Sequence, residues 1–320
     1  MAGHKAAVIG LGVMGMRMLG SMQRYAGFDV LCAWDPSDAA CRAASREYPK
    51  LVIADDAEAA IGHEKVEVVY IACPPLQHDL YARLAMDAGK AVWCEKPLGV
   101  DIAASEALVN YAKAKGRVNI VNFSLASAAA TGEIERLLAD AQIGAVHGID
   151  LRIHFSAWPR AWQQGAASWL ALRHQGGFAR EVVSHWVYLS QRLFGAVALD
   201  AAAARYPEPP GCETHLVAHA TAASIPFSVA CSVGGAGPDE VEYTLWGEHM
   251  SCRIVDWNRL FVCHAGGEWG AALTEIEDPR EVGYERQLAN AALAVSGGEH
   301  SMPDFAGALS VQRIIEKMLA

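Results

Sequence analysis

Glu181 and His185 lie four residues apart in the mostly apolar segment 175–185, QGGFAREVVSH. Four residues make about one helical turn, so both side chains would project from the same helix face and could touch. An imidazole with its ordinary pKa suits a general base near neutral pH, and a neighbouring carboxylate can fix its tautomer or hold a substrate hydroxyl. The same spacing also fits an exposed ion pair, or a buried histidine whose hydrogen bonds are already satisfied.

A glycine-rich stretch near the N-terminus points to a second chemistry. Gly10-x-Gly12-x-x-Gly15 directly follows a strand-like run and opens a helical segment, which is the context in which such glycines hold a pyrophosphate at a helix N-terminus. Asp35 follows twenty residues beyond Gly15, at the end of the second strand-like run. A carboxylate there accepts hydrogen bonds from a ribose 2′-hydroxyl and repels a 2′-phosphate, so the pattern predicts NAD, with NADP less favoured. The alternative is a glycine turn followed by Asp35 as a helix N-cap.

Two more segments lie where strands are expected to end: IACPPLQH at 71–78 and WCEKPLG at 93–99. Ligands of doubly wound sheets bind at the carboxyl ends of the strands. Lys96, between a buried strand and a proline, would project near the sheet edge and could polarise a hydroxyl or carbonyl, although a strand-end lysine can also simply reach solvent. The expected cofactor-binding residues are Gly10, Leu11, Gly12, Val13, Met14, Gly15, Asp35, Cys73, Pro74, Pro75, His78, Glu95, Lys96 and Pro97.

The elements that must position these residues change character at about residue 122. Before it, apolar strand-like runs alternate with amphipathic helical segments, which predicts an α/β Rossmann domain with a doubly wound parallel sheet over 1–122. After it, strand-like runs follow one another with short turns, which predicts an α+β domain with a large, mostly antiparallel, open-faced sheet over 123–320. Helices are expected in this domain near 158–172, 178–194, 281–296 and 303–319.

Composition excludes several classes of function. Asp and Glu outnumber Lys and Arg by 36 to 26, so we expect no nucleic-acid partner. Eight cysteines without a C-x-x-C pair are typical of reduced thiols in a cytoplasmic protein. No apolar stretch reaches the length of a membrane span, and the glycines of the first apolar run argue against a signal peptide. No second histidine or carboxylate cluster joins Glu181 and His185 at ligand spacing, so no metal site is expected.

Taken together, these motifs make the sequence resemble the family of glucose-fructose oxidoreductase, inositol dehydrogenase and the rhizopine-catabolism oxidoreductases (Gfo/Idh/MocA). The segments that carry the resemblance are VIGLGVMG at 8–15, IACPPLQH at 71–78, GKAVWCEKPL at 89–98, GGFAREVVSH at 176–185 and DFAGALSVQRIIEKM at 304–318. The resemblance implies that Lys96 contacts the nicotinamide ribose and the substrate oxygen, and that a cis peptide bond precedes Pro97. It also implies that the acid and the histidine of the fourth segment line the substrate pocket.

Three positions depart from the family pattern. Glu181 stands where the family usually has Asp, and Ala126 and Ser127 replace a common Arg-Phe pair after the last Rossmann strand. Arg180 lies beside the acid, where sugar-active members tend to be apolar. Each departure weakens the expectation of a sugar substrate.

The expected function is hydride transfer between a nicotinamide cofactor and a secondary hydroxyl or carbonyl of a small polar substrate such as a sugar, a polyol or a derivative. Lys96 and His185 are the expected catalytic pair, with Glu181 beside them, and the expected substrate contacts are Lys96, Trp162, Arg180, Glu181 and His185. Trp158, Trp162 and Trp169 would share one helix face, which is more often core packing than a platform for a substrate ring.

Two alternatives remain open. Arg180, with the nearby Arg152, Arg160 and Arg173, could bind a carboxylate, which would suit a reductase of a C=O or C=N bond in an acidic substrate. The fold also resembles NAD-dependent glycosidases and a dinucleotide sensor without turnover. We expect a homodimer or homotetramer formed through the open sheet face, because strands such as FSVACSV are apolar on both faces.

Overall fold

The computed structural model describes residues 3–320, which divide into two compact units. The first unit holds the residues up to Phe123 together with Tyr284–Gln312, and the second holds Ser124–Gly283 with Arg313–Ala320. The last two helices, α9 (Pro279–Val295) and α10 (Phe305–Leu319), therefore each cross from one unit to the other along the chain. The functional division into a cofactor domain over 1–122 and a substrate domain over 123–320 stays a prediction.

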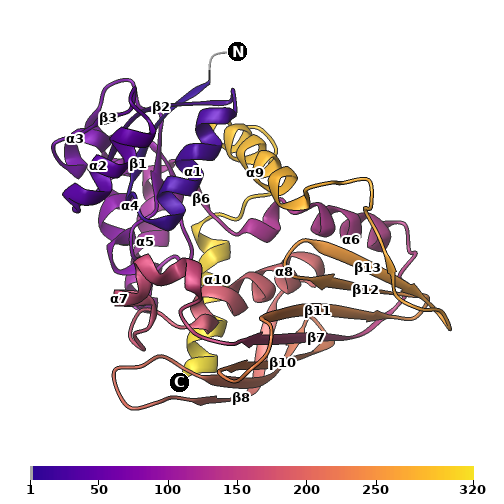
Figure 1. Ribbon diagram of the computed structural model, residues 1–320. Helices are drawn as coiled ribbons and strands as arrows, with labels where there is room; N and C mark the ends of the chain where they lie inside the picture. The colour runs from indigo at the N-terminus through magenta and orange to yellow at the C-terminus, as the bar shows by residue number, and fades with distance from the viewer. Residues whose placement is uncertain (1–2) are drawn as a thin grey trace. The chain divides into compact units, whose positions relative to one another are not determined.

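The first unit contains a six-stranded sheet in the order β3-β2-β1-β4-β5-β6, with every pair parallel. Helices α1 to α5 connect these strands and surround the sheet (Figure 1). This is the expected doubly wound arrangement. The strands are β1 (His4–Ile9), β2 (Phe28–Trp34), β3 (Val52–Ile53), β4 (Val68–Ile71), β5 (Ala91–Cys94) and β6 (Asn119–Val121).

Burial on both faces explains why these strands are continuous in apolar residues. All four residues of β4, VVYI, are buried, as are Ala6–Ile9 of β1. Three of the five connecting helices begin at a side chain that accepts a hydrogen bond from a free backbone N–H group, and these side chains are Ser37, Asp56 and Asp101. The helices are α1 (Val13–Arg24), α2 (Asp38–Glu47), α3 (Ala57–Gly62), α4 (His78–Asp87) and α5 (Ile102–Lys115).

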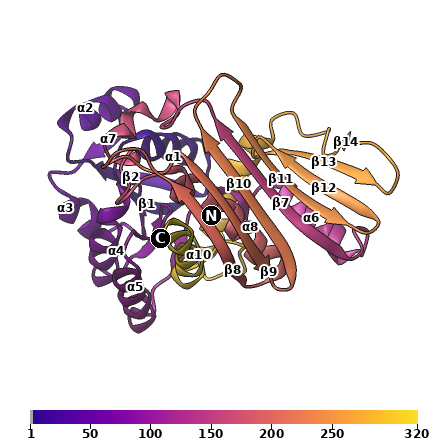
Figure 2. The ribbon, with the colours of Figure 1, turned by 90° about the horizontal axis from the view of Figure 1, so that it is seen from below.

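The second unit contains an eight-stranded sheet in the order β14-β13-β12-β11-β7-β10-β9-β8, visible from below in Figure 2. Only the β7–β10 pair is parallel, so the expected mostly antiparallel sheet is confirmed. The strands are β7 (Val146–Phe155), β8 (Val197–Arg205), β9 (His215–Ala222), β10 (Ile225–Val233), β11 (Glu240–Gly247), β12 (Met250–Val255), β13 (Arg259–His264) and β14 (Gly270–Ala271).

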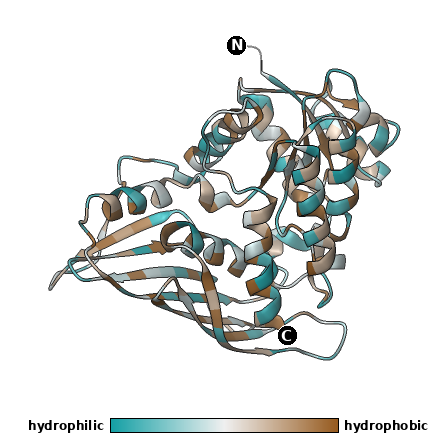
Figure 3. Ribbon diagram, turned by 180° about the vertical axis from the view of Figure 1, so that it is seen from behind, coloured by the Kyte–Doolittle hydropathy of each residue, from teal (hydrophilic) through white to brown (hydrophobic). Residues whose placement is uncertain are grey.

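The two faces of this sheet differ. Helices α6 (Ala129–Ala139) and α8 (Ser184–Phe194) lie over one face (Figure 1), and Trp186 of α8 stacks on Tyr243 of β11. Strands facing them alternate: β9 buries every second residue, and the residues between are exposed or half-buried. The hydropathy colouring of Figure 3 shows apolar and polar positions interleaved along the strands. On β10 the positions between the buried ones are occupied by the small residues Ser228 and Ala230.

Two helical segments of the second unit differ from the expected ones. The segment 158–172 forms a 3₁₀ stretch, Ala161–Ala166, and one α-helical turn, α7 (Ala167–Leu170). Trp158 lies outside both and directly precedes Pro159, so the three tryptophans do not share one helical face. The segment 178–194 begins with a π-helical turn, Ala179–Val183, which continues into α8. π-helical turns are rare and are frequently found at functional sites.

Candidate functional site

The glycine loop between β1 and α1 combines two tight contacts with one open position. A Cβ on Gly10, where φ is +95°, would lie 2.7 Å from the backbone of Ala72, and a Cβ on Gly15 would lie 1.9 Å from the carbonyl oxygen of Gly10. No atom lies within 4 Å of the position that a Cβ on Gly12 would occupy. The first and third glycines therefore pack the loop against the end of β4, and the second leaves the backbone accessible to a ligand.

The N-terminus of α1 is suited to an anion. Gly12 is its N-cap, no side chain caps the helix, and its first turn, which includes Val13 and Met14, holds no acidic residue. Free N–H groups and the positive end of the helix dipole are thus available there without a competing carboxylate. Leu11, just before them, is buried and anchors the loop. These features fit a pyrophosphate.

Asp35 ties the loop to the end of β2. One carboxylate oxygen accepts a hydrogen bond from the amide of Leu11 at 2.7 Å, and the other accepts one from the amide of Ser37 at 2.7 Å. Ser37, not Asp35, is the N-cap of α2, so the alternative of Asp35 as the helix cap is wrong. A carboxylate has about four lone-pair sites, so these two bonds leave capacity for ribose hydroxyls.

The loop Cys73–Pro75 after β4 is joined to the loop after β5 by one imidazole. His78 is fully buried, with Nε2 2.9 Å from the carbonyl oxygen of Cys73 and Nδ1 2.9 Å from that of Pro97. Burial lowers the pKa of His78, and the charge of Lys96 acts in the same direction. Both ring nitrogens thus face carbonyl oxygens of the protein, of which a neutral ring donates to one, and this favours a role between the two loops over direct cofactor contact.

Glu95, Lys96 and Pro97 follow β5, and each has a different environment. The buried carboxylate of Glu95 accepts hydrogen bonds from the Tyr70 hydroxyl at 2.5 Å and from Asn122 Nδ2 at 2.7 Å. It therefore faces an internal polar network rather than the outside of the sheet. Lys96 is buried at the carboxyl end of the strand, and the Lys96–Pro97 peptide bond is cis, as the resemblance implied.

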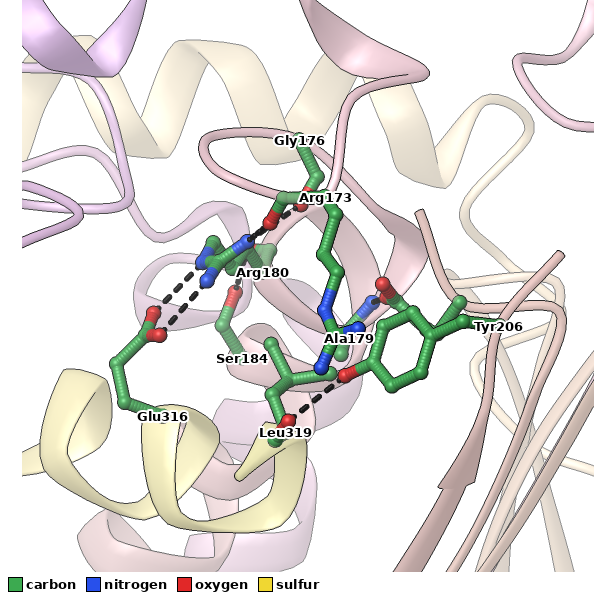
Figure 4. A network of polar contacts seen from close by, with 9 residues as sticks. Arg173, Gly176, Ala179, Arg180, Ser184, Tyr206, Glu316 and Leu319 are labelled. Carbon is green, nitrogen blue, oxygen red and sulfur yellow. Dashed lines mark hydrogen bonds and ion pairs between the residues drawn. The ribbon is translucent and has the colours of Figure 1, made fainter. Parts of the chain in front are cut away.

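In the second unit, Arg180 is committed to partners within the protein. Its guanidinium makes two hydrogen bonds to Glu316 of α10, at 2.6 and 2.7 Å, and two to the carbonyl oxygens of Arg173 and Gly176 (Figure 4). Burial acts to lower the pKa of Arg180, but the hydrogen bonds and charge of Glu316 outweigh it and the pKa is raised. The expected role of Arg180 in binding a substrate carboxylate is therefore corrected: four of its donors already have acceptors.

His185 and Glu181 stand in different surroundings on the same helical segment. His185 is buried, with Nδ1 3.5 Å from Ser124 Oγ and its ring edge-to-face with Trp257 at 5.2 Å. Glu181 is half-buried, and its Oε1 accepts a hydrogen bond from Gln163 Nε2 at 3.3 Å. The burial of His185 does not fit the alternative of an exposed ion pair.

The aromatic and basic residues before this segment have partners of their own. The side chain of Trp162 is 43% exposed, and the Arg160 guanidinium lies 4.8 Å from its ring centre. Arg152 pairs with Glu240, and Arg173 stacks on Tyr206 at 3.7 Å. The structure therefore does not bring the four arginines together as one carboxylate-binding cluster.

Glu213 is a further buried residue beside this segment, and the sequence pattern does not predict it. Only 1% of it is exposed, and Oε1 accepts a hydrogen bond from the amide of Ala179 at 2.7 Å. Burial raises the pKa of Glu213 to about 7, while the amide of Ala179 and the charge of Arg180 lower it. Nothing in the local sequence GCETH marks this residue, because its partner lies 34 residues earlier in the chain.

Within residues 3–320, no three His, Cys, Asp or Glu side chains are grouped so that they could hold a metal ion. No helix in the same residues is both long and apolar enough to cross a membrane.

Comparison with known proteins bears on the first unit. The Gfo/Idh/MocA family model, an oxidoreductase family with an NAD-binding Rossmann fold, matches residues 4–123. Residues 4–123 of this chain are therefore similar to that family. The resemblance inferred from the sequence is thereby confirmed, and the expected NAD agrees with the family's description.

The relatives match over a stretch of similar length. Inositol 2-dehydrogenase 1 of Saccharopolyspora erythraea is 33% identical over 115 residues, which is 35% of this chain and 34% of the relative. A 1-carboxy-3-chloro-3,4-dihydroxycyclohexa-1,5-diene dehydrogenase of Comamonas testosteroni is 30% identical over 120 residues, 38% of this chain and 30% of the relative. The chain thus matches about a third of the length of these curated relatives.

The fold is shared over nearly the whole chain. A levoglucosan dehydrogenase solved with NADH and levoglucosan has a TM-score of 0.85, covers 99% of this chain and 96% of its own, and is 19% identical. At this identity the likeness shows a common fold and no more.

The corrected role of Arg180 gives a stability prediction. Because Arg180 and Glu316 are largely buried, Glu316→Gln should leave a poorly paired buried charge and lower the free energy of unfolding by about 3 kcal/mol. The matched control is Arg152→Gln, which breaks the exposed Arg152–Glu240 pair and should cost less than about 1 kcal/mol. Urea denaturation of the three proteins measures both effects. Equal losses in the two variants would contradict the assigned role.

Proposed function

We propose that this protein is an NAD-dependent dehydrogenase or reductase that transfers hydride between nicotinamide and a secondary hydroxyl or carbonyl of a small polar substrate. The substrate class that we favour is a sugar, a polyol or a derivative of one. The observation that carries the proposal is the open backbone at Gly12, at the uncapped N-terminus of α1, with Asp35 tied to the same loop. This arrangement has the shape and charge to hold a dinucleotide.

In the proposed complex, the amides at Gly12, Val13 and Met14 bind the pyrophosphate, and Asp35 accepts hydrogen bonds from the adenosine ribose. When bound, the nicotinamide would accept or donate the hydride. The loops at Cys73–Pro75 and Glu95–Pro97 would border the nicotinamide, because they lie at the carboxyl ends of β4 and β5. His78 would keep these two loops together, and Glu95 would brace the second loop from the interior.

The proton chemistry is assigned to Lys96 and His185. The Lys96 ammonium stabilises the developing alkoxide, and the His185 imidazole removes the hydroxyl proton, or returns it in the reverse direction. Glu181 orients His185 or holds a neighbouring substrate hydroxyl. Trp162, partly exposed, offers a ring face to a substrate. The burial of His185 against Trp257 supports a base that is shielded from bulk water.

The name of one relative supports a polyhydroxylated substrate. The relative from Saccharopolyspora erythraea is an inositol 2-dehydrogenase, and its name denotes a ring compound with several hydroxyls. The alternative reductase of an acidic substrate was motivated by Arg180, whose guanidinium is held by Glu316. Arg180 therefore no longer favours a reductase of an acidic substrate.

One experiment tests the proposal as a whole. Purified protein is incubated with polyols, sugars, sugar acids, hydroxy acids and imino acids, with NAD or NADP, in both directions, while nicotinamide absorbance at its reduced-form maximum is followed. Turnover of a polyol or sugar with NAD is the expected result. Tightly retained cofactor without net turnover on any compound would instead point to an NAD-dependent glycosidase or a sensor.

Asp35 sets the expected cofactor preference. Asp35→Ser removes the charge that repels a 2′-phosphate, so the NAD to NADP ratio of kcat/KM should fall by about tenfold or more, equivalent to about 1.4 kcal/mol per decade. The matched control is Asp38→Ser, which changes an exposed carboxylate three residues away. An unchanged ratio in Asp35→Ser would remove Asp35 from the cofactor site.

His185 is the expected base. His185→Ala should lower kcat by roughly 10²–10⁴-fold, because proton transfer then falls to water, while NAD affinity persists and the protein still folds. His300→Ala, at an exposed position near the end of the chain, is the control. Activity of His185→Ala within a few-fold of the wild type would rule it out as the base.

We also propose that the open face of the second unit's sheet joins copies of this chain into a homodimer or homotetramer. Val217 and Trp246, 54% and 40% exposed, are the large apolar side chains that support this. Light scattering at micromolar concentration should give the mass of two or four chains. The double variant Val217→Lys, Trp246→Lys should shift this mass toward that of a single chain. A wild-type monomer under these conditions would contradict the proposal.

A further inference from the structure

Glu213 and Ala179 join two distant parts of the second unit. Glu213 lies just before β9, and its carboxyl group is buried against the start of the π-helical turn Ala179–Val183. Oε1 accepts the hydrogen bond from the amide of Ala179, whereas Oε2 has no hydrogen-bond partner among residues 3–320. A buried oxygen without a partner is costly, so the side chain must contribute something that an apolar residue in its place would not.

The two glycines before this turn, Gly176 and Gly177, both lie in close contacts, and Gly177 packs against the buried carboxyl group of Glu213. At Gly177, where φ is +99°, a Cβ would lie 2.3 and 2.5 Å from the two carboxyl oxygens of Glu213. At Gly176 a Cβ would lie 2.2 Å from the carbonyl oxygen of Leu170. Gly176 is therefore needed for the close approach of the Leu170 backbone, and Gly177 for its positive φ beside the carboxyl group of Glu213.

Ala179 connects this contact to the candidate base. Its amide donates to Glu213, and its carbonyl oxygen accepts a hydrogen bond from the amide of Ser184, the residue that precedes His185. The Ser184 hydroxyl also bonds back to the carbonyl oxygen of Arg180 at 2.7 Å (Figure 4). The register of the π-helical turn is thus fixed at its first residue, and a change there would rotate the side chains that follow.

We propose that Glu213 is a positioning residue that holds the start of the π-helical turn through Ala179 and thereby sets the direction in which Glu181 and His185 project. The proposal rests on the proposed function for the part that concerns turnover. The part that concerns the backbone at 177–185 stands independently of any activity.

The required property is a hydrogen-bond acceptor of the right length rather than a negative charge. Burial raises the pKa of Glu213 to about 7, so the carboxyl is partly protonated near neutral pH, and the carbonyl oxygen of the neutral acid still accepts from Ala179. An amide of equal length keeps this acceptor. An unbranched apolar side chain of similar length fills the same space without it.

The experiment compares Glu213→Gln with Glu213→Met. Both fill the site, and only the first accepts a hydrogen bond from Ala179. Glu208→Gln, an exposed position in the same connecting segment, is the control. Three quantities are measured for each protein: the unfolding temperature, NADH affinity by fluorescence, and backbone hydrogen exchange in peptides that cover 177–185, followed by kcat and KM on the substrate found in the panel.

Glu213→Gln should match the wild type within about threefold in kcat and in exchange rate. Glu213→Met should remain folded and bind NADH within twofold, but its amides at 177–185 should exchange about tenfold faster or more, and kcat should fall by about tenfold or more. Exchange and kcat in Glu213→Met equal to those of the wild type would overturn the proposal, as would equal losses in Glu213→Gln and Glu213→Met.

The exchange measurement separates this proposal from the proposed function. If the wild type turns over none of the compounds, the dehydrogenase assignment fails, and faster exchange in Glu213→Met still supports the positioning role on its own. If the wild type is active and exchange does not respond to Glu213→Met, the positioning role fails and the dehydrogenase assignment stands.

Discussion

The buried hydrogen bonds around the segment 176–185 are the constraint on which the second unit's candidate site depends. Arg180 and Glu213 are both buried beside one helical start, and each has a hydrogen-bond partner from a distant part of the chain: Glu316 for the first and the amide of Ala179 for the second. Buried charged groups require such partners, because desolvation without them is costly. The backbone conformations of Gly176, Gly177, the π-helical turn and the first residues of α8 therefore depend on one another.

In the first unit the corresponding constraint is the parallel sheet. Parallel strands buried on both faces end at one edge, and every candidate cofactor group follows the carboxyl end of β1, β2, β4 or β5. Local contacts then shape the edge: Asp35 holds the glycine loop, and His78 joins the loops after β4 and β5. The internal network of Tyr70, Glu95 and Asn122 turns one carboxylate inward and so separates its role from that of its neighbour Lys96.

The sequence predicted the regular parts well because they follow from periodic patterns. Apolar runs identified the parallel strands, and Gly10, Gly12 and Gly15 identified the loop. The errors lie where one contact outweighs the pattern. The stripe of Trp158, Trp162 and Trp169 suggested one helix, but the chain before Ala161 is not helical. Arg180 looked like a group for a substrate because its acceptor, Glu316, lies 136 residues away.

By itself, the sequence determined the two fold classes, the glycine loop and the place of Lys96 at the end of a strand, because these depend on residues that are neighbours along the chain. It also named Glu181 and His185, but spacing alone left their burial open. Only the tertiary structure decided that Arg180 is an internal anchor and that Glu213 lies against Gly177 and Ala179. The physical reason is that a buried polar group is defined by the partner that satisfies it, and folding brings that partner from a distant part of the chain.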